Sequence, residues 1–428
     1  MRAKAPLSLA SRRSRVGMKM ESDEAMTVSA SVFSADGLNL RPSAIRAFAR
    51  ILVDPAIISF AGGLPNPETF PTDRIAFYAD RVIRDRKGIS LQYGPTAGLL
   101  RLRESIMAIQ QERGIRSTPA DVLVTTGSQQ GLALISQALL DPGDVVLVEL
   151  PTYIGAASAF HSRRADMVGV AQDDEGIVPD SLESAAKLVA GSGRRVKFLY
   201  TIPNFQNPSG RLMTQARRAQ VLDLAKRYDF LIVEDDPYGE LVYVSGVDTT
   251  PMKAADDEDR VIYLSSFSKV LAPGLRCGWI SCAPPLLAKF ELTKEAFDLC
   301  SGMLDQSIVD EFCAGGELPG QIDKVREFYR ARRDLFIAEL SSHFEGKADW
   351  TPADGGLFTF LTLRDDRDTA ALVPRSIELG VAYIPGAPFF VDGSGASSMR
   401  LTFAKEPDDR LREGVRRLHQ LLFSEESS

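Results

Sequence analysis

The sequence predicts an α/β fold with a mostly parallel sheet, and three observations carry this prediction. Short segments that are apolar on both faces recur through the middle of the chain and alternate with helical segments, which is typical of a parallel sheet covered on both sides. Small or charged polar residues follow these segments, at the position where open parallel sheets bind ligands. The 428 residues, 44% of them hydrophobic, are enough for a large core and a second domain.

The first part of the predicted core begins with a helix. Residues 98–113 form an amphipathic pattern that ends at Gly114. The strand DVLVTTGS (121–128) comes next, and QQGLALISQALL continues from it as a helix. The following strand is DVVLVELPTY (144–153), in which valine and leucine occupy both faces.

Three further strands complete the core. They are RVKFLYTIPN (195–204), DFLIVEDD (229–236) and VIYLSS (261–266). Between the first two, Thr214 can cap a helix that runs through Tyr228. Together these elements predict an α/β core over about residues 90–300.

The last third of the chain has a different character. Residues 318–344 carry apolar positions at helical spacing and predict a long helix that joins two domains. GLFTFLTL (356–363) and SSMRLTFA (397–404) alternate like strands, and residues 410–422 form a closing helix. These elements predict a smaller α+β unit.

Composition excludes several classes of protein. The net charge of -7 gives no reason to expect a nucleic acid partner, and no apolar run approaches the ~20 residues that a membrane helix needs. The three histidines have no metal spacing, which argues against a zinc enzyme and a Ser-His-Asp hydrolase. The four cysteines include no CxxC pair, and so few thiols indicate a reducing compartment, which we expect to be the cytoplasm.

The first 25 residues are basic, with six lysines and arginines before the first acid, Glu21. They contain no apolar segment of the kind that a secretory signal needs. We expect a disordered tail here; an organelle transit peptide and a start at a later methionine remain open alternatives.

Polar residues gather at the ends of the predicted strands. Residues 127–129 open a helix, whose free N–H groups and dipole suit a phosphate. The residues at these ends are Gly127, Ser128, Gln129, Tyr153, Asn207, Asp235, Tyr238, Ser266, Ser268, Lys269 and Arg276. We expect Asp236 to be a solvated neighbour of this set, and Cys277 and Trp279 to be core residues on one strand face.

One ligand accounts for all of these side chains. It has a phosphate for the hydroxyls and Arg276, a flat ring for Tyr153, a basic ring nitrogen for Asp235 and an aldehyde for Lys269. That ligand is pyridoxal 5'-phosphate. A carboxylate beside the ring nitrogen keeps it protonated. A lysine near an arginine in a low-dielectric site can lose its proton and form a Schiff base.

At this point the sequence resembles the fold-type I pyridoxal-phosphate-dependent aminotransferases of class I/II. The resemblance rests on GSQQG, PNFQNPSG, EDDPYG and SxSKxxxPGxRxGW (Ser266 to Trp279), and it covers nearly the whole chain from about Ser43. Within the family the sequence is most similar to the α-aminoadipate and kynurenine aminotransferases, through RPSAIR (41–46), SFAGGLPNPETFP (59–71) and QYGPTAGLLRLRE (92–104). Ser209 departs from the family's common threonine.

The resemblance implies a role for each matching residue. Lys269 forms the Schiff base, Asp235 pairs with the ring nitrogen and Tyr153 stacks on the ring, as the catalytic set. Asn207 and Tyr238 bind the ring hydroxyl, while Ser128, Gln129, Ser266, Ser268 and Arg276 surround the phosphate and Tyr93 reaches the partner subunit's phosphate. Arg400 binds the substrate α-carboxylate, with Asn207, Gly63, Leu64 and Arg46 also near the substrate. The Asn207–Pro208 peptide bond is a candidate for the cis form.

The implied fold is a large domain with a mostly parallel seven-stranded sheet between helices, plus a smaller α+β domain. We expect a tail over residues 1–25, a segment over 26–85 that includes part of the small domain, the large cofactor-binding domain over 86–315 and the C-terminal small domain over 316–428. The resemblance also implies a homodimer with shared active sites.

The implied reaction is transfer of an amino group from an α-amino acid to a 2-oxo acid, with 2-oxoglutarate as the expected acceptor. The same cofactor set also supports a β-lyase, decarboxylase, cyclase or oxidase reaction. A non-enzymatic cofactor sensor is a further alternative, although the residues before the family match are too few for a DNA-binding domain. A structural pseudoenzyme conflicts with the complete set of cofactor residues.

Overall fold

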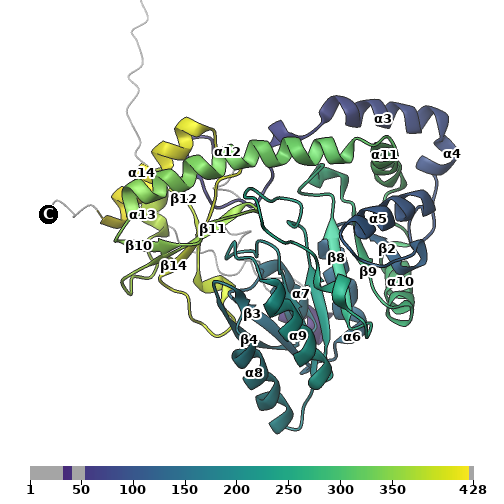
Figure 1. The fold of residues 1–428 in the computed structure, drawn as a ribbon, viewed down its shortest axis with the longest axis horizontal. Coiled ribbons are helices and arrows are strands. Elements are labelled where there is room, and N and C mark those ends of the chain that lie inside the picture. The colour runs from purple at the N-terminus through teal and green to yellow at the C-terminus, as the bar shows by residue number, and fades with distance from the viewer. Residues whose placement is uncertain (1–31, 41–53, 424–428) are drawn as a thin grey trace, which may run out of the picture.

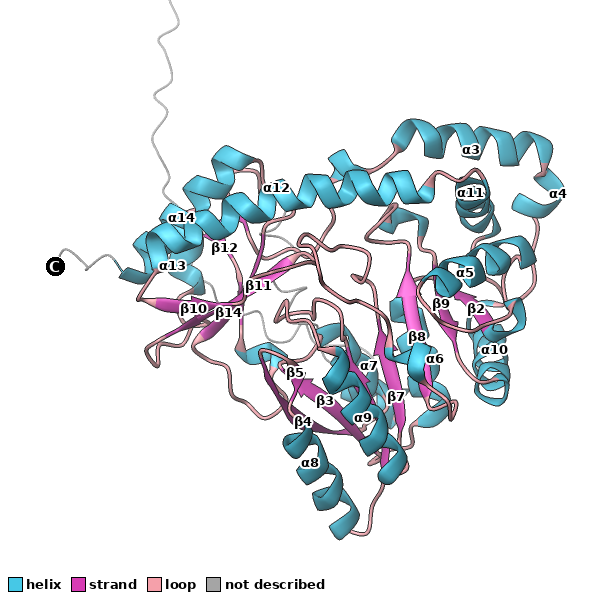
Figure 2. Ribbon diagram, in the orientation of Figure 1, coloured by secondary structure: helices cyan, strands magenta, loops and turns pink. Residues whose placement is uncertain are grey.

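The two larger of the three sheets in the described residues lie in different parts of the protein, and a long helix runs beside both (Figure 1). The structure is a computed structural model and describes residues 32–40 and 54–423. The expected basic tail and Arg46 lie outside the described residues. Figure 2 shows the strands of the two sheets as separate groups joined by loops and helices.

The large sheet has the strand order β2-β9-β8-β7-β6-β3-β4-β5. Its strands are β2 (Val122–Thr125), β3 (Val145–Leu150), β4 (Asp166–Asp173), β5 (Gly176–Ile177), β6 (Val196–Thr201), β7 (Leu231–Asp235), β8 (Val261–Ser266) and β9 (Gly278–Ser281). Pairing is parallel from β4 through β3, β6 and β7 to β8, and antiparallel where β9 joins β8 and β2.

This arrangement confirms the predicted α/β fold with a mostly parallel sheet. The eighth strand, β5, goes beyond the seven expected. It is a two-residue strand antiparallel to β4. The chain can fold back there because Gly176 adopts a φ of 100°, which a residue with a side chain rarely does.

Helices cover both faces of the large sheet. They are α5 (Leu100–Glu112), α6 (Ser128–Leu139), α7 (Ile154–Ser162), α8 (Pro179–Gly191), α9 (Gln215–Arg227), α10 (Pro284–Asp298) and α11 (Met303–Ala314). Alternate residues of β3 enter different cores: Val146 and Val148 pack in one, and Val145 and Leu147 pack in the other. Burial on both faces explains why the strand is apolar at successive positions. As predicted, Thr214 caps α9, with its side chain accepting from the N–H of Arg217.

The smaller sheet is antiparallel, in the order β10-β11-β14-β13. Its strands are β10 (Ala348–Trp350), β11 (Phe358–Leu363), β13 (Ile384–Pro385) and β14 (Ser398–Thr402). Helix α12 (Leu318–Phe344) packs along α14 (Asp408–Phe423) beside this sheet and reaches α11 at its other end (Figure 1). The predicted strands at 356–363 and 397–404 and both predicted helices are therefore present.

The N-terminal part of the described chain joins the C-terminal unit. Strand β1 (Ile58–Ser59) pairs in parallel with β12 (Val381–Ala382), which follows α13 (Val373–Glu378). The remaining helices of the described residues are α1 (Ala35–Asn39), α3 (Thr72–Asp85) and α4 (Lys87–Ser90), with 3-10 turns at Pro67–Thr69, Pro119–Asp121, Met252–Ala255, Pro273–Leu275 and Ala387–Phe389. Residues near position 60 thus reach the junction of the two sheets.

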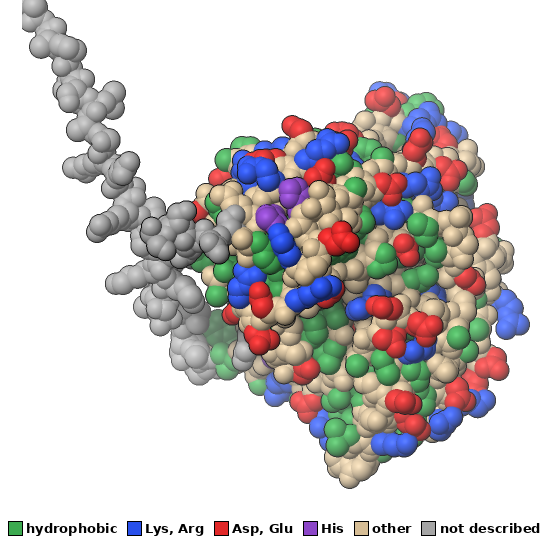
Figure 3. Space-filling model, turned by 60° about the vertical axis from the view of Figure 1, so that its left-hand side comes forward, with side chains coloured by type: hydrophobic (Ala, Val, Ile, Leu, Met, Phe, Trp, Pro, Cys, Tyr) green, Lys and Arg blue, Asp and Glu red, His purple; other side chains and the backbone are tan. Residues whose placement is uncertain are grey.

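The surface mixes charges of both signs. On the face drawn in Figure 3, basic and acidic side chains are interspersed rather than gathered by sign. Within the described residues, no helix combines the length and the apolar character needed to cross a bilayer.

Candidate active site

A pocket opens where the carboxyl ends of the large sheet's strands face the smaller sheet. It encloses about 1030 Å³, including the part open to solvent. Its lining consists of Gly63, Leu64, Ser128, Gln129, Tyr153, Ile202, Asn207, Asp235, Pro237, Tyr238, Ser266, Ser268, Lys269, Pro273, Arg276, Phe358 and Arg400. The fold therefore brings together every predicted site residue except Tyr93 and Arg46. These residues come from five strand ends and from both sheets, which is the ligand position expected of an open α/β sheet.

Lys269 lies in the turn after β8, with its amine inside the pocket. Its Nζ donates to the carbonyl oxygen of Gly63 at 3.0 Å and lies 6.0 Å from the centre of the Tyr238 ring. Burial lowers the pKa of the Lys269 amine to about 8, and the positive charges of Arg400 and Arg276 act in the same direction. A substantial fraction of this amine is neutral near pH 8, so it can act as a nucleophile and as a base.

Asp235 is the last residue of β7, and only 3% of it is exposed. Its Oδ2 accepts from the hydroxyl of Tyr200 at 2.9 Å. Its Oδ1 has no hydrogen-bond partner among the described residues. Burial raises the pKa of Asp235 to about 7, with the Tyr200 hydrogen bond opposing the shift and the charge of Asp236 adding to it. A cationic hydrogen-bond donor at the free Oδ1 would stabilise the charged form of this buried carboxylate.

The start of α6 forms a cradle for an anion. Gly127 has a φ of 78°, and a Cβ there would lie 2.8 Å from Nη2 of Arg276. Arg276 in turn donates from Nη2 to the carbonyl oxygen of Thr126 at 3.1 Å, which holds its guanidinium beside the helix N-terminus. The hydroxyl of Ser128 is buried and has no partner within the described part of the chain. Free N–H groups, a free hydroxyl and a guanidinium together suit a phosphate.

The same cradle receives Ser266 and Ser268 from the turn after β8. The N–H of Ser268 donates to Oγ of Ser266 at 3.2 Å, so the two serines form one turn next to Lys269. Gln129 lies one residue further along α6, and its Nε2 donates to the carbonyl oxygen of Gly155 at 3.0 Å. The hydroxyls and the lysine are therefore placed by the same short loop.

Tyr153 and Asn207 lie beside two cis proline bonds, Leu150–Pro151 and Asn207–Pro208. The second of these confirms the prediction; the first was not predicted. Tyr153 lies over the first turn of α7, where Gly155 leaves room for the ring, since a Cβ there would meet Tyr153 Cζ at 2.4 Å. The Tyr153 hydroxyl lies 3.4 Å from Oε1 of Gln129.

Arg400 lies within β14 and is 2% exposed. Its Nη1 donates to Oδ1 of Asn207 at 3.0 Å, and its Nη2 donates to the carbonyl oxygen of Ala61 at 2.7 Å. The guanidinium lies 4.4 Å from the ring centre of Phe358 and 5.3 Å from that of Phe389. Burial lowers the pKa of Arg400 to about 10, and its Nε has no partner in the described residues. The Arg400 guanidinium is therefore a cation held in a fixed position, with a geometry that can bind a carboxylate.

Phe358 and Ile202 are pocket residues that the sequence did not reveal. Phe358 packs edge-on against Tyr238, with ring centres 6.0 Å apart. In the sequence it is one apolar residue of an alternating strand, and nothing in that pattern separates a pocket wall from the core. Burial raises the pKa of the Tyr238 phenol, so this hydroxyl remains a donor at neutral pH.

Two predicted residues are not in this pocket. Tyr93 lies in the loop after α4 and is 78% exposed. Its proposed role lies in a partner subunit's site, so this position does not test it. Arg46 lies outside the described residues.

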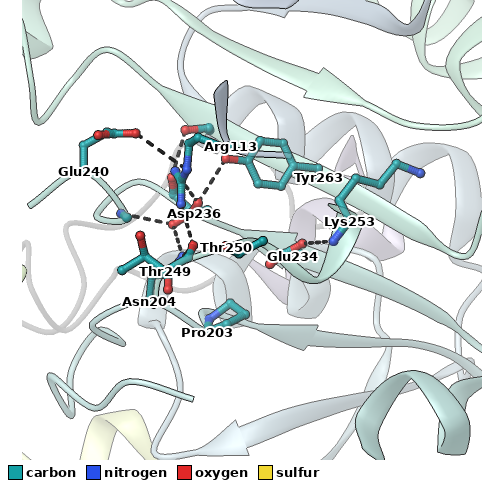
Figure 4. A network of polar contacts seen from close by, with 12 residues as sticks. Arg113, Pro203, Asn204, Glu234, Asp236, Glu240, Thr249, Thr250, Lys253 and Tyr263 are labelled. Carbon is teal, nitrogen blue, oxygen red and sulfur yellow. Dashed lines mark hydrogen bonds and ion pairs between the residues drawn. The ribbon is translucent and has the colours of Figure 1, made fainter. Parts of the chain in front are cut away.

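The expectation that Asp236 is solvated is wrong. Asp236 is 1% exposed and forms an ion pair with Arg113, with 2.7 Å between Oδ2 and Nη1 (Figure 4). It also accepts from the Tyr263 hydroxyl at 3.0 Å and from Nδ2 of Asn204 at 2.9 Å. Successive strand residues point to opposite faces, so Asp235 enters the pocket while Asp236 enters this network behind it.

The unpartnered atoms of the pocket match the cofactor predicted from the sequence. Oγ of Ser128, Oδ1 of Asp235 and Nε of Arg400 are all buried without a partner in the described residues. They offer a hydroxyl for a phosphate, a carboxylate oxygen for a protonated ring nitrogen and a donor for a substrate carboxylate. The donor set therefore fits pyridoxal 5'-phosphate with an amino acid beside it.

Comparison with known proteins gives an independent line of evidence. The family model described as aminotransferase class I and II matches residues 69–418. Aromatic-amino-acid aminotransferase 1 of Thermococcus litoralis is 41% identical over 394 residues, which is 92% of this chain and 94% of that protein. The 2-aminoadipate transaminase of Thermus thermophilus is 36% identical, covering 90% of this chain and 94% of that protein.

Solved structures agree in fold. The crystal structure of Pyrococcus horikoshii kynurenine aminotransferase, in complex with PMP, KYN as substrates and KYA as products, has a TM-score of 0.88 and 40% identity. The match covers 92% of this chain and 97% of that one. LysN, the α-aminoadipate aminotransferase of Thermus thermophilus complexed with N-(5'-phosphopyridoxyl)-L-leucine, has a TM-score of 0.83 and 35% identity, with the same coverage of both chains.

Proposed function

The chain belongs to the class I and II aminotransferases, and from this premise we propose that its amino donors are aromatic and long aliphatic α-amino acids, with 2-oxoglutarate as the acceptor. The protein is therefore an enzyme that uses pyridoxal 5'-phosphate to transfer an amino group from an amino acid to a 2-oxo acid.

The proposed donor class is based on the apolar side chains that line the pocket next to Arg400. Phe358 contacts the guanidinium of Arg400, and Leu64 and Ile202 line the same pocket. An apolar side chain gains free energy by burial against such a wall. Among the described residues of the pocket, the cations are Lys269, Arg276 and Arg400. Each of these has a proposed role at the cofactor or at the substrate α-carboxylate. Relatives named for aromatic amino acids and for kynurenine support this range.

We propose the following roles for the residues of this chain. Arg400, held by Asn207 and Ala61, binds the α-carboxylate and fixes the direction of the amino acid. Tyr153 covers the ring of the cofactor, and Ser128, Gln129, Ser266, Ser268 and Arg276 hold its phosphate. Asp235 presents its free Oδ1 to the ring nitrogen, and Asn207 and Tyr238 lie at the ring hydroxyl.

When bound, pyridoxal phosphate supplies an electron sink for negative charge at the substrate's Cα. Lys269 is the base that would take the proton from the substrate's Cα and deliver it to C4′ of the bound cofactor. Its lowered pKa leaves part of the amine neutral at neutral pH, as this step requires. The carbonyl oxygen of Gly63 holds the amine in place at 3.0 Å.

We further propose a homodimer in which Tyr93 reaches the partner's phosphate site. An aromatic side chain with 78% of its surface exposed supports an interface at this loop, as does Leu91 at 60% exposure. Mass by light scattering would test the dimer, and Tyr93→Phe would test the contact. The four cysteines are all free thiols, buried or half-buried, and we propose the cytoplasm as the compartment.

The experiment that tests the donor class is a half-reaction. The purified holoenzyme is mixed with a panel of single amino acids without an oxo acid, and the visible absorbance of the cofactor is followed. Aromatic and long aliphatic amino acids should bleach the band at low concentration, and 2-oxoglutarate should restore it. A panel in which only glutamate or aspartate bleaches the band contradicts the proposed donor class.

A further inference from the structure

A buried polar cluster behind the pocket joins two of its loops. It consists of Glu149 on β3, Thr201 and Ile202 at the end of β6, and Gln206 in the loop that follows. Glu149 and Gln206 are each 1% exposed, and neither lines the pocket. Neither residue has a role in the proposed reaction.

Glu149 anchors the cluster. Its Oε1 accepts from the Thr201 hydroxyl at 2.6 Å, and its Oε2 accepts from the N–H of Ile202 at 3.1 Å and from Nε2 of Gln206 at 3.1 Å. Burial raises the pKa of Glu149 to about 7, while these hydrogen bonds oppose the shift. The side chain is therefore held at both of its oxygens, and a shorter acid could not reach all three donors.

Gln206 connects this anchor to two turns. Its Nε2 also donates to the carbonyl oxygen of Pro151 at 2.6 Å, and its Oε1 accepts from the N–H of Ser209 at 2.7 Å. Pro151 begins the turn that presents Tyr153. Ser209 belongs to the turn that presents Asn207. One amide group thus spans two loops that are 55 residues apart in sequence.

Both turns place pocket side chains. Asn207 bonds to Arg400 at 3.0 Å between Oδ1 and Nη1, and Tyr153 shares the pocket with them. The two turns have no side-chain hydrogen bond to each other besides those of Gln206 among the described residues. The pairing of β3 with β6 sets the strands that precede these turns, and the Gln206 amide adds the side-chain link between the turns themselves.

We propose that Gln206, anchored by Glu149, is a positioning residue that fixes the Tyr153 ring relative to the Asn207–Arg400 pair. Its effect on catalysis is indirect: it sets where the cofactor ring lies with respect to the bound carboxylate. This inference rests on the proposed function, because it takes Tyr153 and Asn207 to face the cofactor. Misplacement of reacting groups by about 1 Å can reduce a rate about 100-fold.

The test uses two variants and one matched control in the full-length holoenzyme. Gln206→Met removes the amide while keeping the length of the side chain. Glu149→Asp keeps the charge and shortens the reach, which provides a milder variant if Gln206→Met does not fold. Gln110→Met is the control, since Gln110 is also 1% exposed but lies in α5, outside the cofactor pocket.

Three measurements separate positioning from stability. They are the melting temperature, the circular dichroism of the bound cofactor's visible band, and kcat and KM for one aromatic donor. We expect Gln206→Met to reduce kcat about 10- to 100-fold and to change the visible circular dichroism. Glu149→Asp should produce the same changes to a smaller degree. Gln110→Met should lower the melting temperature and leave the spectrum and kcat as in wild type.

Two results would overturn the inference. The first is a Gln206→Met enzyme, or a Glu149→Asp enzyme if Gln206→Met does not fold, with wild-type kcat and an unchanged visible circular dichroism spectrum. The second is a Gln110→Met enzyme that loses kcat to the same extent, which would make the effect one of general stability. Failure of the proposed function looks different, because the wild-type protein would then show no visible cofactor band or no bleaching by any donor.

Discussion

The amine of Lys269 and the carbonyl oxygen of Gly63 lie 3.0 Å apart, although 206 residues separate them in the chain. Lys269 follows a strand of the large sheet, whereas Gly63 follows β1, which pairs with β12 of the C-terminal unit. The contact therefore joins the two halves of the pocket at the proposed nucleophile.

Replacement of this lysine tests the central assignment. We expect Lys269→Ala to lose the visible band of the covalently held cofactor and to reduce the rate of amino-group transfer at least about 1000-fold, since both the nucleophile and the base are removed. Absorbance and single-turnover kinetics measure these two effects. A variant that keeps more than a tenth of the wild-type rate contradicts the assignment.

The lowered pKa of Lys269 should be visible in its reactivity. In the cofactor-free protein, the rate of modification by an amine reagent should rise with pH and level off above about 8, because the neutral amine predominates there. Exposed lysines of the same protein should continue to gain reactivity up to about pH 10. Peptide mass spectrometry after labelling distinguishes the two. A Lys269 that titrates with the exposed lysines contradicts the prediction.

Asp235 should destabilise the cofactor-free protein at neutral and higher pH. Its folded-state pKa of about 7 lies above the ordinary value. The stability associated with its protonation is therefore present at low pH and is lost as pH rises through 7. We expect Asp235→Asn to stabilise the cofactor-free protein by about 2 kcal/mol at pH 8 and by much less at pH 4, as measured by urea unfolding. The same variant should bind pyridoxal phosphate more weakly. Equal effects at both pH values would show that burial does not shift this group.

Arg113 should stabilise the protein through Asp236. Removing it leaves the buried carboxylate without its ion-pair partner (Figure 4). We expect Arg113→Met to lower the free energy of unfolding by about 3 kcal/mol. The double variant Arg113→Met/Asp236→Asn removes both charges and should recover part of this loss. No recovery in the double variant would show that the guanidinium acts through its bond to the Thr249 carbonyl instead.

Arg400 should govern binding of the amino acid more than binding of the cofactor. Arg400→Lys keeps a positive charge but loses the planar contacts with Phe358, Asn207 and Ala61. We expect KM for the donor to rise about 10- to 100-fold, with the affinity for pyridoxal phosphate changed less than threefold. Steady-state kinetics and cofactor titration of the same preparation provide the comparison. A loss of affinity confined to the cofactor would contradict the proposed role of Arg400 in binding the amino acid.

The sequence was sufficient for the parts of the site that follow strands. Asp235 ends an apolar strand, and Lys269 and Asn207 follow such strands within a few residues. The ends of parallel strands meet at one edge of a sheet. Local signals of this kind also placed the cap at Thr214 and the cis bond at Asn207–Pro208.

The sequence was not sufficient where function depends on distant partners. The partner of Asp236 is Arg113, which follows the last residue of helix α5, and no local pattern links the two. Gln206 and Phe358 look like ordinary loop and strand residues, because their importance lies in what they contact. Strand β5 has two residues, too few for a periodic pattern.

The division of the pocket between the two sheets has a consequence over many catalytic cycles. The residues proposed to hold the phosphate and ring come mainly from the large sheet, whereas Arg400 and Phe358 belong to the smaller one. The proposed carboxylate site is therefore anchored in a different sheet from the proposed phosphate cradle. Under the proposed function, each product can leave and the next substrate can enter at the smaller sheet while a single cofactor molecule stays held by the large one.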